Sequence, residues 1–367
     1  MKLWHIAALL VAGLAVGAAF PYRFTAIFGQ ATLYVFLPAL IFEAAWNLDF
    51  HLMRQAWRPI AMLAVPGVAL TAGVIAVCVH FIGTFAWDAA LLLGAILSAT
   101  DPIAVVAVFR RLKVPRQLAT IVESESLLND AVAVVVYRAI IASIVLSGGT
   151  AAVWHAAWMA VLGAAAGIAL GLAIAYAAAF MLRKQIGAPV QAAASFAGAY
   201  GGYILADRFN LSGIFTVLAF GIGLRELERH RISVTAAQGV ESIWEIAALT
   251  ANVALFFLIG AALDFRRLTH TLPAVGITLL AVLAARILLS NGLLAILRER
   301  VQIAWRSVIR MAGIRGALSL ALALATPGAI AQRSLIIDAT LGVVIVTILA
   351  GTLTLRPRLR GLDLGSD

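Results

Sequence analysis

The feature that constrains this chain most is a succession of twelve apolar segments separated by short polar stretches. A helix needs about 20 apolar residues to cross about 30 Å of hydrocarbon. Hydrophobic residues make up 63% of the sequence and charged residues only 12%, against about 25% charged in soluble domains. The segments are 3–20, 27–48, 59–82, 88–109, 117–146, 152–181, 190–206, 210–224, 240–262, 271–297, 304–326 and 335–355.

This pattern predicts an all-α polytopic membrane protein with about 12 transmembrane helices. The loops are short, so we expect residues 1–367 to form a single transmembrane unit with no soluble domain. The opening stretch MKLWHIAALLVAGLAVGAAF has no convincing cleavage site, and we interpret it as the first helix. Tryptophans near segment ends, Trp46 and Trp57 among them, are typical of interfacial anchors.

The basic residues indicate an orientation. With the N-terminus in the cytoplasm, eighteen Lys and Arg residues fall at the termini and in cytoplasmic loops, and five fall in outside loops. Cytoplasmic loops carry the excess of positive charge in membrane proteins. We therefore expect a multi-pass protein of the cell membrane, here a bacterial inner membrane, with both termini in the cytoplasm. Because the net charge of +10 is spread over these loops, it does not indicate nucleic-acid binding.

Five acidic residues fall well inside apolar segments, where a charge at the bilayer centre costs about 2.5–3.5 kcal/mol even on the most lenient scale. Such residues face protein or water and mark ion pathways by default. The five are Glu43, Asp101, Glu125, Asp130 and Glu245. Their cost predicts a functional site inside the membrane.

Two segments carry signals for an interrupted helix. In AALLLGAILSATDPIAVVAVF, Pro102 lacks an N–H and pushes Asp101 toward an extended backbone, so we expect unwinding near Thr100 and a free Thr100 carbonyl. In SVIRMAGIRGALSLALALA, Gly313 and Gly316 flank Arg315. Paired interruptions in two segments seven spans apart are typical of inverted-repeat transporters, whose broken helices form a site at the midplane.

The stretch ESESLLND, residues 123–130, supplies the remaining polar groups. On a helix, Ser126 and Asp130 share one face, and Glu125 and Asn129 share the neighbouring stripe. Hard oxygen ligands suit a cation such as sodium, whereas zinc or copper would call for His or Cys. Burial favours the protonated Asp130, and a nearby cation favours the carboxylate. A proton and a metal ion would then compete for one group, which is sufficient for exchange.

Glu125 needs a partner if it is buried, and Arg286 in VLAARILLSNG is a plausible one, so we interpret this pair as a structural ion pair in the core. Glu43 could complete the ion site or pair with Arg315. The residues alone leave both open. Glu245 could pair with an arginine within the membrane, and we leave it out of the primary site.

Four motifs now resemble, in order, the signatures of monovalent cation:proton antiporters of the NhaP/NHE type. They are LPALIFEAAWNLDF, GAILSATDPIAVVAVFRRLKVPRQLATIVESESLLNDAVAVVVY, LFFLIGAALDF and GIRGALSLALALATP. The resemblance extends over essentially the whole chain. It implies the NhaA/NapA-like antiporter fold, with inverted repeats and two crossing broken helices. It also implies an elevator-like movement of a core domain, including 88–146 and 271–355, against a dimerisation domain.

The resemblance further implies a Na⁺ site formed by the Thr100 carbonyl, Asp101, Ser126 and Asp130. Asn129 before Asp130 looks like the Asn-Asp signature of the electroneutral branch, and Glu43 matches the family's glutamate in FEA. Glu125 and Arg286 match a pair that holds two helices together, and Arg315 matches the arginine of the second broken helix. Members are usually homodimers, although they commonly have a further helix before the segment that begins this chain.

The resulting hypothesis is a secondary active antiporter that exchanges Na⁺ (or Li⁺ or K⁺) for H⁺ and serves pH homeostasis. It is not an enzyme and needs no cofactor. A cation channel or a non-transporting ion sensor on the same scaffold is the alternative. A channel needs weak binding at several sites along a continuous pore, whereas this sequence has one dense cluster of carboxylates. An intramembrane aspartyl protease using Asp101 and Asp130 is disfavoured because Asp101, before Pro102, lacks the usual catalytic context.

Overall fold

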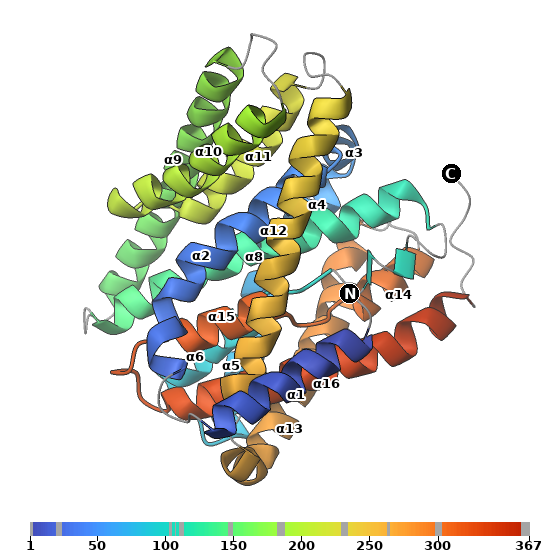
Figure 1. The fold of residues 1–367 in the computed structure, drawn as a ribbon. Coiled ribbons are helices and arrows are strands. Elements are labelled where there is room, and N and C mark those ends of the chain that lie inside the picture. Colours follow the sequence, from blue (N-terminus) through green and yellow to red (C-terminus); the bar gives the residue numbers. More distant parts are fainter. Residues whose placement is uncertain are drawn as a thin grey trace. The chain divides into compact units, whose positions relative to one another are not determined.

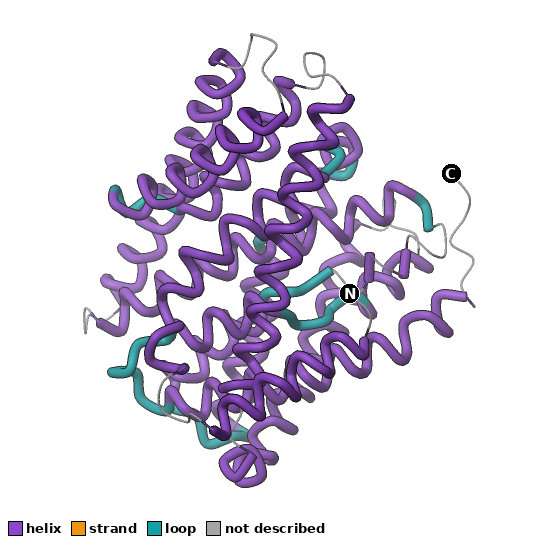
Figure 2. The backbone as a smooth tube through the Cα atoms, viewed as in Figure 1, coloured by secondary structure: helices purple, strands orange, loops and turns teal. Residues whose placement is uncertain are grey.

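The computed structural model describes residues 3–19, 24–102, 105–106, 108–109, 114–145, 150–181, 188–228, 234–262, 265–297 and 303–360. This part of the chain is helical almost throughout and contains no strand (Figures 1 and 2). Six helical stretches within it are long and apolar enough to cross a membrane. The predicted all-α membrane fold is confirmed, while the number of spans stays a prediction.

The chain forms two compact units. Unit 1 consists of Met1–Gly29, His51–Ile141 and Leu255–Asp367, and unit 2 of Gln30–Phe50 and Ala142–Ala254. Unit 1 thus holds both interrupted segments and most of the ESESLLND helix. The moving core and the dimerisation domain stay predictions.

The helices follow the predicted segments closely. Unit 1 contains α1 (Leu3–Ala19), α3 (Phe50–Gln55), α4 (Trp57–Ala64), α5 (Pro66–Phe81), α6 (Trp87–Ser98), α8 (Arg116–Val145), α13 (Phe265–Leu288), η1 (Leu289–Leu293), η2 (Leu294–Leu297), α14 (Ile303–Met311), α15 (Ala317–Ala325) and α16 (Arg333–Arg360). Unit 2 holds most of α2 (Phe24–Asn47), α9 (Thr150–Met181), α10 (Ala188–Arg208), α11 (Gly213–Glu228) and most of α12 (Val234–Ala262).

Several basic residues used for the orientation, including Arg110, Arg111 and Lys113, lie outside the described residues. The cytoplasmic placement of the termini therefore stays a prediction.

In unit 2, glycines set the spacing between α9 and α11. Gly163, Gly167 and Gly171 recur every fourth residue and so share one face of α9. A Cβ on Gly167 would lie 2.6 Å from the Ser212 carbonyl oxygen, and one on Gly171 would overlap the Thr216 carbonyl. In lipid, where apolar side chains gain little by leaving the solvent, such close backbone approach is a main source of helix association.

Aromatic rings fill the interior of unit 2. Phe42 of α2 lies 4.1 Å from Trp244 of α12 between ring centroids, and Trp244 stacks on Phe196 at the same distance. Trp46 is only 1% exposed, stacks on Phe42 and carries the Arg225 guanidinium over its ring. The expectation that Trp46 is an interfacial anchor is therefore wrong, because its ring completes this core.

In unit 1, α5 packs against α6 and α13, and α16 packs against α13 and α15. α6 lies so close to α5 that a Cβ on Gly94 would overlap the Ala72 carbonyl. The segment predicted as one helix over 271–297 instead changes form after Leu288, where a π turn and then a 3₁₀ turn follow. Unit 1 therefore combines long helices with short and distorted ones.

We predict that Gly167→Ala destabilises the protein although alanine is the better helix former. The added methyl group must displace the backbone around Ser212, and overpacking of this kind costs about 1–3 kcal/mol. Gly201→Ala is the matched control, since a Cβ there meets nothing within 4 Å. Thermal melting of the purified protein in detergent measures both. Equal melting temperatures for the two variants would contradict the close α9–α11 contact.

Candidate functional site at the two interrupted helices

The first interruption follows α6. The helix ends at Ser98, and Ala99 adopts an extended conformation with φ −61° and ψ 139°. Helical hydrogen bonding is present again where the Val106 N–H donates to the Pro102 carbonyl at 2.8 Å. The predicted unwinding at Thr100 and Asp101 is confirmed, and it results from the proline that cannot continue the helix.

The second interruption separates α14 from α15. α14 ends at Met311 and α15 begins at Ala317, with Gly316 extended at φ −136° and ψ −157°. The Arg315 N–H donates to the Thr347 hydroxyl of α16 at 3.2 Å. A Cβ on Gly316 would overlap the Asp101 carboxyl group. Glycine is therefore required here because the two interruptions touch.

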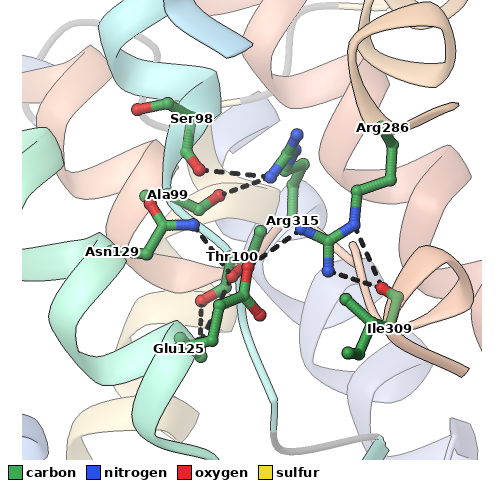
Figure 3. Close-up of polar contacts among 9 residues, drawn as sticks. Ser98, Ala99, Thr100, Glu125, Asn129, Arg286, Ile309 and Arg315 are labelled. Carbon is green, nitrogen blue, oxygen red and sulfur yellow. Dashed lines mark hydrogen bonds and ion pairs between the residues drawn. The ribbon is translucent and has the colours of Figure 1, made fainter. Parts of the chain in front are cut away.

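The unwound segments satisfy each other's backbone groups. The Asp101 N–H donates to the Ile314 carbonyl at 2.8 Å. Arg315, 1% exposed, donates through Nη1 to the Ser98 and Ala99 carbonyls at 3.3 and 3.2 Å (Figure 3). The last carbonyls of a helix lack intrahelical partners and carry partial negative charge. The buried Arg315 guanidinium at the C-terminus of α6 therefore balances that partial charge.

Three oxygen-bearing groups of α8 and the first interruption meet at Thr100. The Ser126 hydroxyl donates to the Thr100 carbonyl. The Asn129 Nδ2 lies 3.4 Å from the Thr100 hydroxyl oxygen (Figure 3). All three side chains are at most 4% exposed. The Thr100 carbonyl was expected to be free and instead accepts this bond, because a buried carbonyl normally takes a donor. Its second lone pair can still face a cation.

Asp130 stands one turn beyond Ser126 on α8 and also takes a hydrogen bond from the Thr100 backbone. Its Oδ1 and the Oδ1 of Asn129 are buried and have no hydrogen-bond partner among the described residues. Buried acceptors in native proteins are almost always satisfied, so each exception needs an explanation. Asp130 bonds to the Thr100 backbone, and the Ser126 hydroxyl bonds to the Thr100 carbonyl. A carboxylate, a carbonyl and a hydroxyl are the kinds of oxygen ligand that suit a hard cation.

Glu125 and Arg286 form a buried ion pair. Arg286 Nη1 lies 2.9 Å from Glu125 Oε1, and the two side chains are 6% and 1% exposed. Arg286 also donates through Nε and Nη2 to the Ile309 carbonyl near the end of α14, at 3.1 and 2.6 Å (Figure 3). One guanidinium thus joins α8, α13 and α14 just before the second interruption. Gly313 is packed against it, since a Cβ there would lie 2.7 Å from Arg286 Nε.

The charged groups of the site form one cluster. Asp101, Glu125 and Arg315 all lie close enough to Asp130 to act on it electrostatically, and Arg286 lies similarly close to Arg315. Two guanidinium groups thus balance two of the three carboxylates. One carboxylate charge of the cluster is left without a guanidinium to balance it.

The structure does not bring every predicted residue into this cluster. Glu43 belongs to unit 2, where its Oε1 accepts from Asn47 Nδ2 at 2.9 Å. Arg315 donates to carbonyls of α6. The possible role of Glu43 in the ion site therefore stays a prediction. Glu245, also in unit 2, is exposed on α12.

Sequence reasoning missed the backbone partners of both arginines. The Ser98, Ala99 and Ile309 carbonyls carry no side-chain signal, since any residue supplies a carbonyl. Their one visible signature is position, because each lies within three residues of a helix end. Thr347 is a second residue without a signal, because threonine inside an apolar helix commonly bonds its own backbone.

Two interrupted helices that enclose a buried acid define a class of membrane transport protein. The family model of the transmembrane sodium/hydrogen exchangers matches residues 1–361. The chain is 33% identical to the low-affinity Na⁺/H⁺ antiporter NhaS1 of Synechocystis sp., over 91% of this chain and 65% of NhaS1. It is 32% identical to the Na⁺/H⁺ antiporter ApNhaP of Aphanothece halophytica, over 98% of this chain and 70% of ApNhaP. The chain belongs to the sodium/hydrogen exchanger family.

The same fold occurs in a solved structure. The sodium proton antiporter MjNhaP1 from Methanocaldococcus jannaschii at pH 8 superposes with a TM-score of 0.83, over 98% of this chain and 92% of that chain. The sequence identity is 20%, so this likeness establishes the architecture alone. The antiporter fold predicted from the sequence is confirmed.

We predict that Glu125→Ala lowers stability by about 3–5 kcal/mol, because Arg286 would remain as a buried charge without its carboxylate. Thermal melting and protein yield measure the loss. Glu241→Ala, at an exposed position of α12, is the matched control. A Glu125→Ala protein that melts like the wild type but has a shifted apparent cation affinity would instead place Glu125 in the ion site.

Proposed function

We propose that the protein is a secondary active antiporter that exchanges Na⁺, or Li⁺ or K⁺, for H⁺ at Asp130. The observation that carries the proposal is the pair of buried oxygens on Asp130 and Asn129, which have no hydrogen-bond partner among the described residues. The two residues are held at Thr100, Asn129 through its Nδ2 and Asp130 through the Thr100 backbone. The cation ligands in this proposal are Asp130, the Thr100 carbonyl and Ser126. Asp101 and Asn129 complete the site.

Competition between the two substrates follows from the geometry. A protonated Asp130 is neutral and lacks the negative charge that would hold a cation. Loss of the proton leaves a carboxylate whose desolvation is compensated when a cation binds to it. The Ser126 hydroxyl must then turn its hydrogen away from the Thr100 carbonyl, so that both oxygens face the ion. Only one substrate occupies the site at a time, which is the requirement for coupled exchange.

The charge balance of the cluster supports one-for-one, electroneutral exchange. Asp101 and Glu125 are offset by Arg286 and Arg315, and only the charge of Asp130 changes during the cycle. The proton-loaded and cation-loaded clusters therefore carry the same net charge. Because Asn129 stands in place of a second aspartate, only one carboxylate changes its charge in each cycle.

Alternating access completes the proposal. The part that moves includes 88–146 and 271–355, which share unit 1 apart from residues 142–146. It carries the site past the rest of the protein, in a homodimer embedded in the cell membrane with both termini in the cytoplasm. The names of the relatives, both described as Na⁺/H⁺ antiporters, support the substrates. A channel or a non-transporting sensor on the same scaffold is the outcome if no coupled exchange is found.

We predict that Asp130→Ala abolishes exchange and leaves a folded protein, since it removes the one group that both substrates need. Purified protein in liposomes that contain a pH dye is given Na⁺, Li⁺ or K⁺ outside. Cation-driven proton movement is expected for the wild type and for Asp88→Ala, at an exposed position in the first turn of α6, but not for Asp130→Ala. Retained exchange in folded Asp130→Ala would overturn the assignment.

We also predict that a membrane potential drives no exchange in the same liposomes. With Na⁺ and H⁺ gradients set to zero, a K⁺ diffusion potential imposed with valinomycin should cause no Na⁺-dependent change of the internal pH, because one charge crosses in each direction. Sodium is the substrate in this assay because K⁺ sets the membrane potential. Potential-driven proton movement that requires Na⁺ and intact Asp130 would contradict one-for-one exchange.

A further inference from the structure

The two short helices that carry the interruptions are anchored at their far ends by neighbouring residues, Gln332 and Arg333. Gln332 ends the connection between α15 and α16, and Arg333 opens α16. Both side chains bond to backbone groups in unit 1 and to no other side chain that the structure describes. We call these two residues and their backbone partners the brace.

Gln332 holds the chain that leads into α6. Its Oε1 accepts from the Ala86 N–H at 2.8 Å, and its Nε2 donates to the Thr84 carbonyl at 2.8 Å. The side-chain amide thus accepts one backbone hydrogen bond and donates another, as a neighbouring strand would. It links two segments that are 246 residues apart in the sequence. The next residue, Trp87, begins α6. The far end of α6 is therefore fixed in position.

Gln332 adopts a left-handed backbone conformation, with φ 57°. Among the described residues, Asn210 is the only other non-glycine residue with positive φ. Asparagine enters this region readily, whereas a long side chain such as glutamine seldom does. Residues held in such conformations persist where the surroundings require them and gather at functional sites. The two hydrogen bonds that the Gln332 side chain makes offset the cost of this backbone conformation.

Arg333 holds the far end of α15. Its Nε donates to the Thr326 carbonyl at 2.6 Å and its Nη2 to the Leu324 carbonyl at 2.9 Å. These are the orphan carbonyls at the C-terminus of a nine-residue helix, where a cation is favourable. The Tyr137 hydroxyl of α8 donates to the Thr326 hydroxyl at 3.3 Å, two turns along from Asp130. The brace therefore also reaches the helix that carries the ion-binding groups.

Both braced helices end at the ion site. α6 has 12 residues and α15 has nine, so their lengths are about 18 and 14 Å. A tilt of α6 by about 3° at the braced end would move the Thr100 end by about 1 Å. Ligand distances in a metal site tolerate only about 0.2 Å. A hydrogen bond at the braced end of α6 or α15 is thus sufficient to set the geometry at the end that borders the ion site.

We propose that Gln332 and Arg333 are positioning residues that set cation affinity by fixing the far ends of α6 and α15. They touch no ion-binding group. They act through the two short helices, and the distance between the Thr100 carbonyl and Asp130 depends on them. The transport readout rests on the proposed exchange activity, whereas the brace itself can be tested without transport.

The variants are Gln332→Ala and Arg333→Gln, with Gln117→Ala and Arg310→Gln as matched controls at exposed positions of α8 and α14. Two conservative variants, each of which keeps part of the native interactions, should have intermediate effects. Arg333→Lys keeps the charge but loses the fork that reaches two carbonyls. Gln332→Glu can accept from Ala86 but cannot donate to Thr84.

The first readout is amide hydrogen exchange of the folded protein without added cation. Exchange should accelerate at least several-fold in residues 98–102 and 312–316 of Gln332→Ala and Arg333→Gln. There the Asp101 N–H joins the two interruptions and the Arg315 N–H joins the second interruption to α16. Exchange should be unchanged in the controls. Unchanged exchange in these segments of both brace variants would overturn the proposal, whether or not the protein transports ions.

The second readout is cation-driven exchange in liposomes, normalised to folded protein. The apparent KM for Na⁺ should rise about fivefold to tenfold, with the maximal rate within twofold of wild type and Arg333→Lys in between. A loss of folding alone would lower the amount of active protein without moving KM. An unchanged KM would also overturn the proposal. No exchange by the wild type would refute the proposed function and leave the hydrogen-exchange result as the test of the brace.

Discussion

The structure depends on one constraint, which is that backbone groups freed inside a membrane must find partners within the protein. Unwinding at Pro102 releases carbonyls at the end of α6, and unwinding around Gly316 releases N–H groups at the start of α15. The protein places the two interruptions against each other, so that the Asp101 N–H meets the Ile314 carbonyl and Arg315 meets the carbonyls of α6. The proposed ion site consists of groups that this pairing of the two interruptions leaves unsatisfied. The Thr100 carbonyl and the acids of α8 border the only part of the arrangement where described buried oxygens remain unmatched on adjacent residues.

The two interruptions and the buried charges could be predicted from the sequence because particular residue types cause them. Proline at 102, glycines around Arg315 and acids in apolar segments each carry a large energetic cost, and such costs are readable residue by residue. The pairing of Glu125 with Arg286 was also predictable, since two opposite buried charges must find partners and few candidates exist. These expectations concern which groups must be satisfied.

The sequence could not predict which group serves as the partner of each buried polar or aromatic side chain. The carbonyls that bind Arg315 and Arg286 belong to serine, alanine and isoleucine, whose side chains have no part in the contact. Trp46 shows the same limit for packing. Its place near a segment end favoured a membrane interface, but the ring stacks on Phe42 inside unit 2.

The two buried arginines show how the same residue type serves two purposes. Arg286 uses three nitrogens, toward one carboxylate and one carbonyl, and so is held from several directions. Arg315 is buried as deeply, yet its Nε and Nη2 have no hydrogen-bond partner among the described residues. A fully bonded guanidinium fixes a geometry, because moving it breaks every bond at once. A partly bonded one, at the junction of two interrupted helices, leaves two donor nitrogens without a partner among the described residues. The two guanidinium groups thus differ in hydrogen-bond count rather than in burial.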